Sequence, residues 1–109
     1  MKWPILICLA LVSAAQGRSQ TVYYYCTSSS MFRVTRYFSD IFPVQQNVAR
    51  PKIESEFIYY LAVYYNESVS AKANCSAASD VRQAGLDESK EEARYKNMSW
   101  RTVVTKWRY

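Results

Sequence analysis

The sequence contains no histidine and only two glycines. Without histidine, the Ser-His-Asp and Cys-His catalytic systems and every histidine-ligated zinc site are excluded. Gly85 is the only glycine beyond residue 17, so glycine-rich phosphate loops and dinucleotide-binding fingerprints are excluded as well. Long hydrophobic runs are also missing. The run from Ile5 to Val12 has eight residues and is too short to span a bilayer, so the sequence predicts no membrane span.

The first seventeen residues have the layout of a secretory signal peptide. A basic start is followed by the apolar run, and Ala15 and Gly17 are small residues at the spacing that precedes a cleavage site. The sequence therefore predicts a secreted, extracellular protein. We expect residues 1–17 to be the signal peptide and residues 18–109 to form a single secreted α/β domain.

Cysteine is scarce, and only Cys26 and Cys75 lie beyond the predicted signal peptide. Export leads to an oxidising compartment, so we expect these two residues to form one disulfide. The bridge would close a loop of 50 residues, counting both ends. Such a closure stabilises the fold by about 4 kcal/mol. Two separate buried thiols, or a bridge between two molecules, are the alternatives.

Three of the four asparagines beyond residue 17 begin an N-x-[ST] acceptor triplet, which predicts N-glycosylation of an exported chain. Asn66 and Asn97 are the favoured sites because each falls where a helix is expected to end. Asn74 is less favoured because its triplet contains Cys75, and bridge formation competes with glycan transfer. The alternative is that asparagine is simply common at helix ends and turns.

The pattern of apolar residues predicts two strands at the start of the mature chain. Residues 21–27 are rich in β-branched and aromatic side chains, and Val22, Tyr24 and Cys26 are expected to face inward. Three serines at positions 28–30 predict a turn. The segment 32–42 predicts a second strand, whose imperfect alternation indicates either a bulge or a two-faced strand.

Helical spacing of Ile53, Phe57, Tyr60, Leu61 and Tyr64 predicts a helix over residues 51–65. A short strand at 68–76, a second helix at 79–96 and a final strand at 100–109 complete the order ββαβαβ. Ser79 is a possible cap of the second helix, and Gly85 is a possible break in it.

This order predicts an α/β (α+β) fold with a single small mixed sheet. We expect both helices to pack on one face of the sheet and one disulfide to join the first strand to the third. The placement of both helices on one face assumes right-handed crossovers whose strand steps run in the same direction.

Tyrosine is abundant, with ten residues, and some of its rings must lie outside the core. Tyrosines beside basic residues can form a stacking surface for sugars or bases, although tyrosine is also common at half-buried packing positions. The possible binding surface comprises Tyr23, Tyr25, Arg33, Arg36, Lys106 and Arg108. Asp40 lies between apolar residues and is expected to end the second strand or to face solvent.

Several short motifs extend over most of the mature chain: Tyr25-Cys26, Tyr37–Phe42, Phe57 with Tyr60, Cys75, and Val104-x-x-Trp107-x-Tyr109. In this spread the chain resembles small exported single-disulfide domains of unassigned function from bacteria and insect secretions. The resemblance implies a single compact domain with its two cysteines paired. It implies no activity, ligand or catalytic residue.

The mature chain has 13 basic and 9 acidic residues, a mild charge of +4. We expect a small secreted glycoprotein that binds an extracellular protein or a glycan in a secreted fluid, without catalysis, cofactor or metal. The scattered basic residues do not favour nucleic acid. One alternative is a cationic antimicrobial or membrane-active defence protein. The second is a histidine-free small hydrolase or ribonuclease that uses Asp40, Arg36 and nearby tyrosines.

Overall fold

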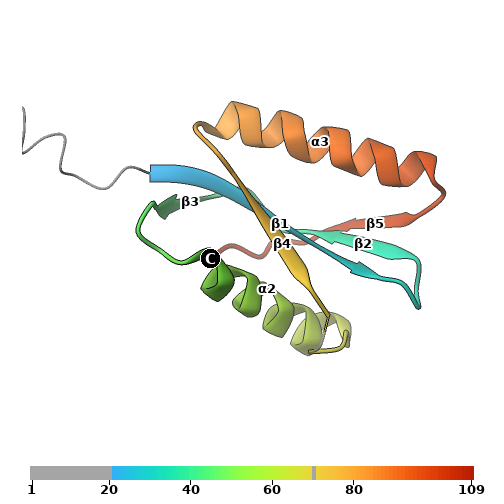
Figure 1. Ribbon diagram of the computed structural model, residues 1–109. Coiled ribbons are helices and arrows are strands. Elements are labelled where there is room, and N and C mark those ends of the chain that lie inside the picture. Colours follow the sequence, from blue (N-terminus) through green and yellow to red (C-terminus); the bar gives the residue numbers. More distant parts are fainter. Residues whose placement is uncertain (1–20, 70) are drawn as a thin grey trace, which may run out of the picture.

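The computed structural model of the protein describes residues 21–69 and 71–109 (Figure 1). The predicted signal peptide, residues 1–17, lies outside the described residues. The elements are β1 (Thr21–Ser30), β2 (Thr35–Phe38), β3 (Phe42–Gln45), α2 (Arg50–Tyr65), β4 (Ala73–Ala78), α3 (Val81–Asn97) and β5 (Arg101–Val104). Within these described residues, a single mixed sheet of five strands, two helices and one disulfide confirm the predicted fold class.

Strand β1 lies at the centre of the sheet. It pairs antiparallel with β4 along one side and with both β2 and β3 along the other. Strand β5 joins the outer side of β2 in parallel, which makes the sheet mixed. The segment predicted as one strand is therefore two strands, β2 and β3, that follow the same neighbour in succession.

A bulge at Ser39 separates β2 from β3, which is one of the two alternatives that the imperfect alternation indicated. The Ser39 amide donates to the carbonyl of Cys26 at 2.8 Å, and the Ser39 hydroxyl accepts from the Cys26 amide at 2.7 Å. One residue thus satisfies both peptide groups of Cys26, and the hydroxyl replaces a missing strand carbonyl. The Asp40 amide donates to the carbonyl of Trp107 at 3.0 Å, so the bulge also anchors the C-terminal segment.

The predicted turn at residues 28–30 is wrong, because these serines belong to β1 and the turn lies at 31–34. The serine side chains are satisfied within the sheet. The Ser28 hydroxyl donates to the carbonyl of Lys72 at 2.8 Å, and Ser29 accepts from Arg36 at 2.6 Å. Phe32, which the sequence placed in a strand, lies in this turn and is 96% exposed.

The two helices lie on opposite faces of the sheet, which corrects the prediction that both pack on one face (Figure 1). The chain steps from β3 across β1 to β4 through α2, and then steps back across the sheet from β4 to β5 through α3. Two crossovers of the same hand that run in opposite directions place their helices on opposite faces. The prediction had assumed steps in one direction.

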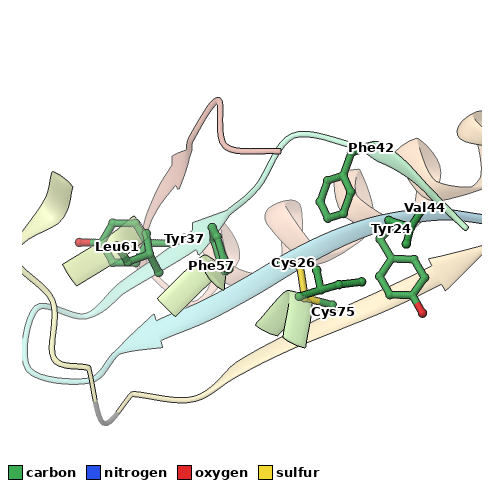
Figure 2. Packing of buried hydrophobic residues seen from close by; sticks show 9 residues of the cluster. Tyr24, Cys26, Tyr37, Phe42, Val44, Phe57, Leu61 and Cys75 are labelled. Carbon is green, nitrogen blue, oxygen red and sulfur yellow. A yellow bond between two sulfur atoms is a disulfide. The ribbon is translucent and has the colours of Figure 1, made fainter. Parts of the chain in front are cut away.

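The main core lies between α2 and the sheet (Figure 2). Helix α2 buries Ile53, Phe57, Ile58 and Leu61, which recur at helical spacing as expected. The predicted helix is confirmed, and it ends at Asn66, whose left-handed conformation caps it. Tyr60 is half-buried, but Tyr64, which was expected in the same apolar stripe, is exposed. The sheet contributes Tyr24, Cys26, Tyr37, Phe42, Val44 and Cys75 to this core.

Helix α3 packs on the other face with a weak apolar side, as predicted, and buries only Ala84 fully among its described residues. Its N-cap is Asp80 and not Ser79, because the Asp80 carboxylate accepts from the Gln83 amide at 2.8 Å. The helix continues through Gly85 without a break. The final strand is shorter than predicted, since residues 105–109 continue beyond β5 without strand pairing.

Candidate functional site

The predicted disulfide is present and joins the two strands as expected. Cys26 of β1 and Cys75 of β4 lie directly opposite each other and are bonded, with both side chains fully buried. The bridge therefore fixes the position of β4 against the central strand.

The six residues of the possible binding surface do not form one surface. Tyr25 and Arg36 come together beneath α3, but Tyr25 is buried. Arg33 lies in the turn between β1 and β2, and its side chain reaches the end of α2, where it donates to the carbonyl of Tyr65 at 3.0 Å and pairs with Glu67 at 3.5 Å. The remaining residues are Tyr23, which is half-buried, and Lys106 and Arg108, which are exposed in the C-terminal segment.

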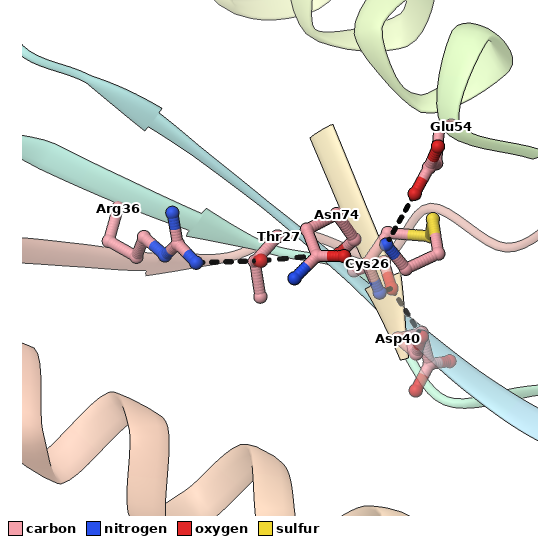
Figure 3. Close-up of a disulfide and its surroundings, with 8 residues drawn as sticks. Cys26, Thr27, Arg36, Asp40, Glu54 and Asn74 are labelled. Atoms are coloured by element: carbon pink, nitrogen blue, oxygen red, sulfur yellow. Dashed lines mark hydrogen bonds between the residues drawn. A yellow bond between two sulfur atoms is a disulfide. The ribbon is translucent and has the colours of Figure 1, made fainter. Parts of the chain in front are cut away.

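Arg36 connects the sheet to α3, and Figure 3 shows its hydrogen bond to Thr27 within the sheet. Its guanidinium pairs with Glu91 at 2.9 Å, donates to Thr27 at 2.8 Å, and lies 4.7 Å from the ring centre of Tyr95. The Tyr25 hydroxyl donates to the same Glu91 carboxylate at 3.4 Å. Burial, followed by the charge of Glu91, raises the pKa of Tyr25 to about 12. These contacts engage both terminal nitrogens of Arg36 within the fold, while its Nε is buried without a hydrogen-bond partner.

Glu88 is the most perturbed carboxyl group of the described chain. Burial raises its pKa to about 7, with further contributions from the charges of Asp40, Glu92 and Glu91. Its Oε2 atom is buried without a hydrogen-bond partner. A carboxyl with such a pKa can act as a general acid or base, but it also needs a space for substrate. None of the three hollows described for this surface is lined by Glu88.

The residues proposed for a hydrolase have other partners. Asp40 is exposed, accepts from the Ile41 amide at 2.8 Å, and lies 3.6 Å from the Arg108 guanidinium. Arg36 is paired with Glu91. The two residues thus end in separate ion pairs and do not point into a common site.

The three predicted glycosylation asparagines are all exposed. Asn66 caps the end of α2, Asn97 is the last residue of α3, and Asn74 lies within β4 beside the disulfide. Each side chain is therefore accessible to a glycan. Asn74 also borders a polar hollow of about 550 Å³ with Arg36 and Lys72.

The outer side of α2 carries the largest group of exposed aromatic side chains on one described helix. Tyr59 is 68%, Tyr64 is 71% and Val63 is 54% exposed. We call these three residues the α2 face. They follow one another at i, i+4 and i+5 along the helix, so they share its solvent side. Large exposed apolar groups that lie together mark interaction surfaces more often than isolated ones do.

Two hollows flank the α2 face, and Tyr59 lines both. The hollow between α2 and the start of β4 has a volume of about 500 Å³ and is called the β4 hollow. The second, the Trp107 hollow, has a volume of about 410 Å³. The lining of the Trp107 hollow comprises Ser55, Glu56, Tyr59, Tyr60, Val63, Tyr64 and Trp107. Clefts of this size with a few polar groups among aromatic rings are typical of ligand sites.

The α2 face was not predicted, because Tyr64 was assigned to the buried stripe and Tyr25 was grouped with the exposed residues. One signal was available. Tyr59-Tyr60 and Tyr64-Tyr65 are two adjacent pairs on one helix, and because neighbouring residues lie about 100° apart around the axis, the four rings cannot all share one buried stripe. Which ring is exposed depends on where the helix packs against the sheet.

The described residues contain no group of three carboxylate, cysteine or histidine side chains placed to hold a metal ion. Across the same part of the chain, no helix has the length and apolar character needed to cross a membrane. No protein-family model, no curated protein and no solved structure matches this chain.

Proposed function

We propose that the protein is a small secreted glycoprotein that acts as a non-catalytic extracellular binding protein and contacts its partner through the α2 face. The observation that carries the proposal is the exposure of Tyr59, Val63 and Tyr64 between two hollows. Tyrosine and tryptophan are enriched at the energetic centres of protein interfaces, where they bury large areas. The partner is an extracellular protein or a glycan.

The proposed extracellular localisation is supported by the signal-peptide layout and by a disulfide of the kind found in exported proteins. Its test is the intact mass of protein collected from culture medium, measured before and after enzymatic glycan removal, with thiol alkylation. We expect loss of residues 1–17, glycan mass at Asn66 or Asn97, and no alkylated cysteine. A full-length, glycan-free product retained in the cell would contradict the extracellular localisation.

The binding role is tested with the labelled protein on a panel of extracellular ectodomains and on a glycan array. Replacing Tyr59 and Tyr64 by Ser should weaken the strongest interaction at least about 30-fold, because central interface aromatics contribute about 2 kcal/mol or more. Leu86→Ser is the matched control, since Leu86 is half-exposed on α3 at the opposite face of the sheet. Equal binding by both variants would exclude the α2 face as the contact.

A further inference from the structure

Strand β4 is an edge of the sheet. Among the described residues it pairs only with β1, so its other side has no neighbouring strand. An open edge presents peptide N–H and C=O groups that can pair with another chain. Protected edges usually carry proline, lysine or a bulge, but β4 has the sequence Ala-Asn-Cys-Ser-Ala-Ala. Its side chains are small and uncharged; Cys75 is fully buried, and the other residues of β4 are half-buried or exposed.

The disulfide pair shows which peptide groups of β4 point outward. Cys26 and Cys75 are register partners, yet both peptide groups of Cys26 bond to Ser39 on the other side of β1. The two cysteines therefore form a non-hydrogen-bonded pair of the ladder. The peptide groups of Cys75 must then point away from β1, toward the open edge. Because the direction of the peptide groups alternates along a strand, those of Ala73 and Ala77 also point toward the open edge.

A side chain of α2 accepts a hydrogen bond from one of these outward-pointing amides. The Cys75 amide donates to the Glu54 carboxylate at 3.1 Å (Figure 3). Glu54 thus supplies the acceptor that a carbonyl of a neighbouring strand would supply. A partner strand would take over this amide, and Glu54, which is half-exposed, would turn to solvent.

The β4 hollow lies beside the first residues of this edge. Its apolar lining includes Ile58, Tyr59 and Val69, and its remaining lining residues are Pro51, Glu54, Ser55, Ala71, Lys72 and Ala73. In strand addition, main-chain hydrogen bonds supply affinity, and hollows for alternate side chains supply selectivity. A strand paired with the start of β4 directs every second side chain to the α2 side. The hollow then receives one of these side chains.

We propose that the open edge of β4 and the β4 hollow together bind an extended peptide segment of a partner protein. The segment adds a sixth strand beside Ala73–Ala78 and places an apolar side chain among Ile58, Tyr59 and Val69. This proposal rests on the proposed binding function and names the form of the partner.

The test uses a synthetic array of eight-residue peptides in which apolar and polar residues alternate, with the full-length secreted protein as the probe. The affinity of the best peptide is measured by biolayer interferometry for wild type, Ala73→Pro and Ala73→Ser. Proline is tolerated at the first residue of an edge strand and removes only the outward N–H. Ala73→Ser keeps that N–H and controls for the changed side chain. Circular dichroism checks that both variants fold.

We expect Ala73→Pro to weaken peptide binding about ten-fold or more, and Ala73→Ser to leave it unchanged. N-methylation of every second peptide amide gives two versions of the peptide. The version whose methylated amides face β4 should not bind, and the version whose methylated amides point away from β4 should bind normally. The proposal is overturned if no array peptide binds, if Ala73→Pro binds normally, or if both methylated versions behave alike. A concentration-dependent dimer that Ala73→Pro abolishes, without peptide binding, would identify a second copy as the occupant and overturns it too.

The same variants separate this proposal from the proposed function. If a partner found on the ectodomain panel loses binding to Tyr59→Ser/Tyr64→Ser but not to Ala73→Pro, strand addition is wrong and the binding function stands. If neither variant changes that binding, the contact through the α2 face is wrong as well.

Discussion

At the scale of single residues, Glu88 makes stability depend on pH. Its pKa is raised from 4.5 to about 7, mainly by burial, so the folded protein holds a proton that the unfolded chain has released. The stability that this group contributes is complete below about pH 4.5 and is lost as the pH rises to about 7. The contribution of Glu88 should therefore make the protein less stable at pH 8 than at pH 4.

Replacing Glu88 by Gln should remove this loss, because the amide stays neutral. We expect the variant to gain about 1 kcal/mol over wild type between pH 4.5 and pH 8, after allowance for solvent screening of the partly exposed carboxyl. Urea unfolding at both pH values measures the difference. Glu56→Gln, an exposed position on α2, is the control. A pH-independent difference between Glu88→Gln and wild type would contradict the assignment.

Arg36 gives a second prediction at this scale. Arg36→Ala should destabilise the fold by about 3 kcal/mol, because it leaves the largely buried Glu91 carboxylate without its cation. The exposed pair between Lys96 and Glu92 on the same helix is the matched control, and Lys96→Ala should cost less than about 0.5 kcal/mol. Denaturant unfolding of both variants decides the point. Equal losses would mean that Arg36 does not hold α3 to the sheet.

At the scale of elements, the C-terminal segment after β5 lies outside the strand but is held by backbone hydrogen bonds and by ring packing. The Thr105 amide donates to the carbonyl of Phe38 at 2.7 Å. The ring of Trp107 lies 5.4 Å from that of Phe42 and 5.1 Å from that of Phe57. This segment therefore extends the main core, and it also lines the Trp107 hollow.

Trp107→Ala should cost about 3 kcal/mol, because it removes a ring that contacts both the sheet and α2. Trp100→Ala is the comparison, since the ring of Trp100 packs on Tyr95 of α3 at 5.2 Å, away from the main core, and its loss should cost about 1 kcal/mol. Thermal and urea unfolding report both values. A smaller loss for Trp107 than for Trp100 would show that the segment is dispensable.

The elements that could be predicted are those whose signals are local. The first helix was predicted within one residue at its start because its apolar spacing and Pro51 act within the helix. The serines at 28–30 gave a turn signal that was wrong, because the hydroxyls of Ser28 and Ser29 find distant partners, the carbonyl of Lys72 before β4 and the side chain of Arg36 in β2. The α2 face could not be predicted, since the exposure of Tyr64 depends on how the helix packs against β1 and β4.

At the scale of the whole molecule, the topology decides where the helices lie. The order of elements was predicted, apart from the division of one strand by Ser39, but the direction of the two crossovers cannot be obtained from the order alone. Strand β4 returns to the far side of β1, so the next crossover must run back across the sheet. The helices are thereby separated, and α2 forms the core while α3 remains largely solvated.

The bridge between Cys26 and Cys75 joins segments separated by 49 residues. Reducing it should lower the free energy of unfolding by about 4 kcal/mol, because the unfolded chain regains the freedom of a long loop. Urea unfolding with and without a phosphine reductant measures the loss, and the Cys26→Ala/Cys75→Ala variant should show no effect of reductant. An unchanged unfolding midpoint on reduction would contradict the prediction.

The same bridge determines how the protein responds to a mechanical load. Tension applied at the two chain ends passes along the covalent chain from Cys26 directly to Cys75, so the loop that contains β2, β3 and α2 cannot be extended. Only the segments outside the loop can unravel under force. Since a chain extends by at most about 3.6 Å per residue, the shielded stretch withholds roughly 170 Å of extension. The loop that contains β2, β3 and α2 would stay closed by the bridge while the segments outside it are extended.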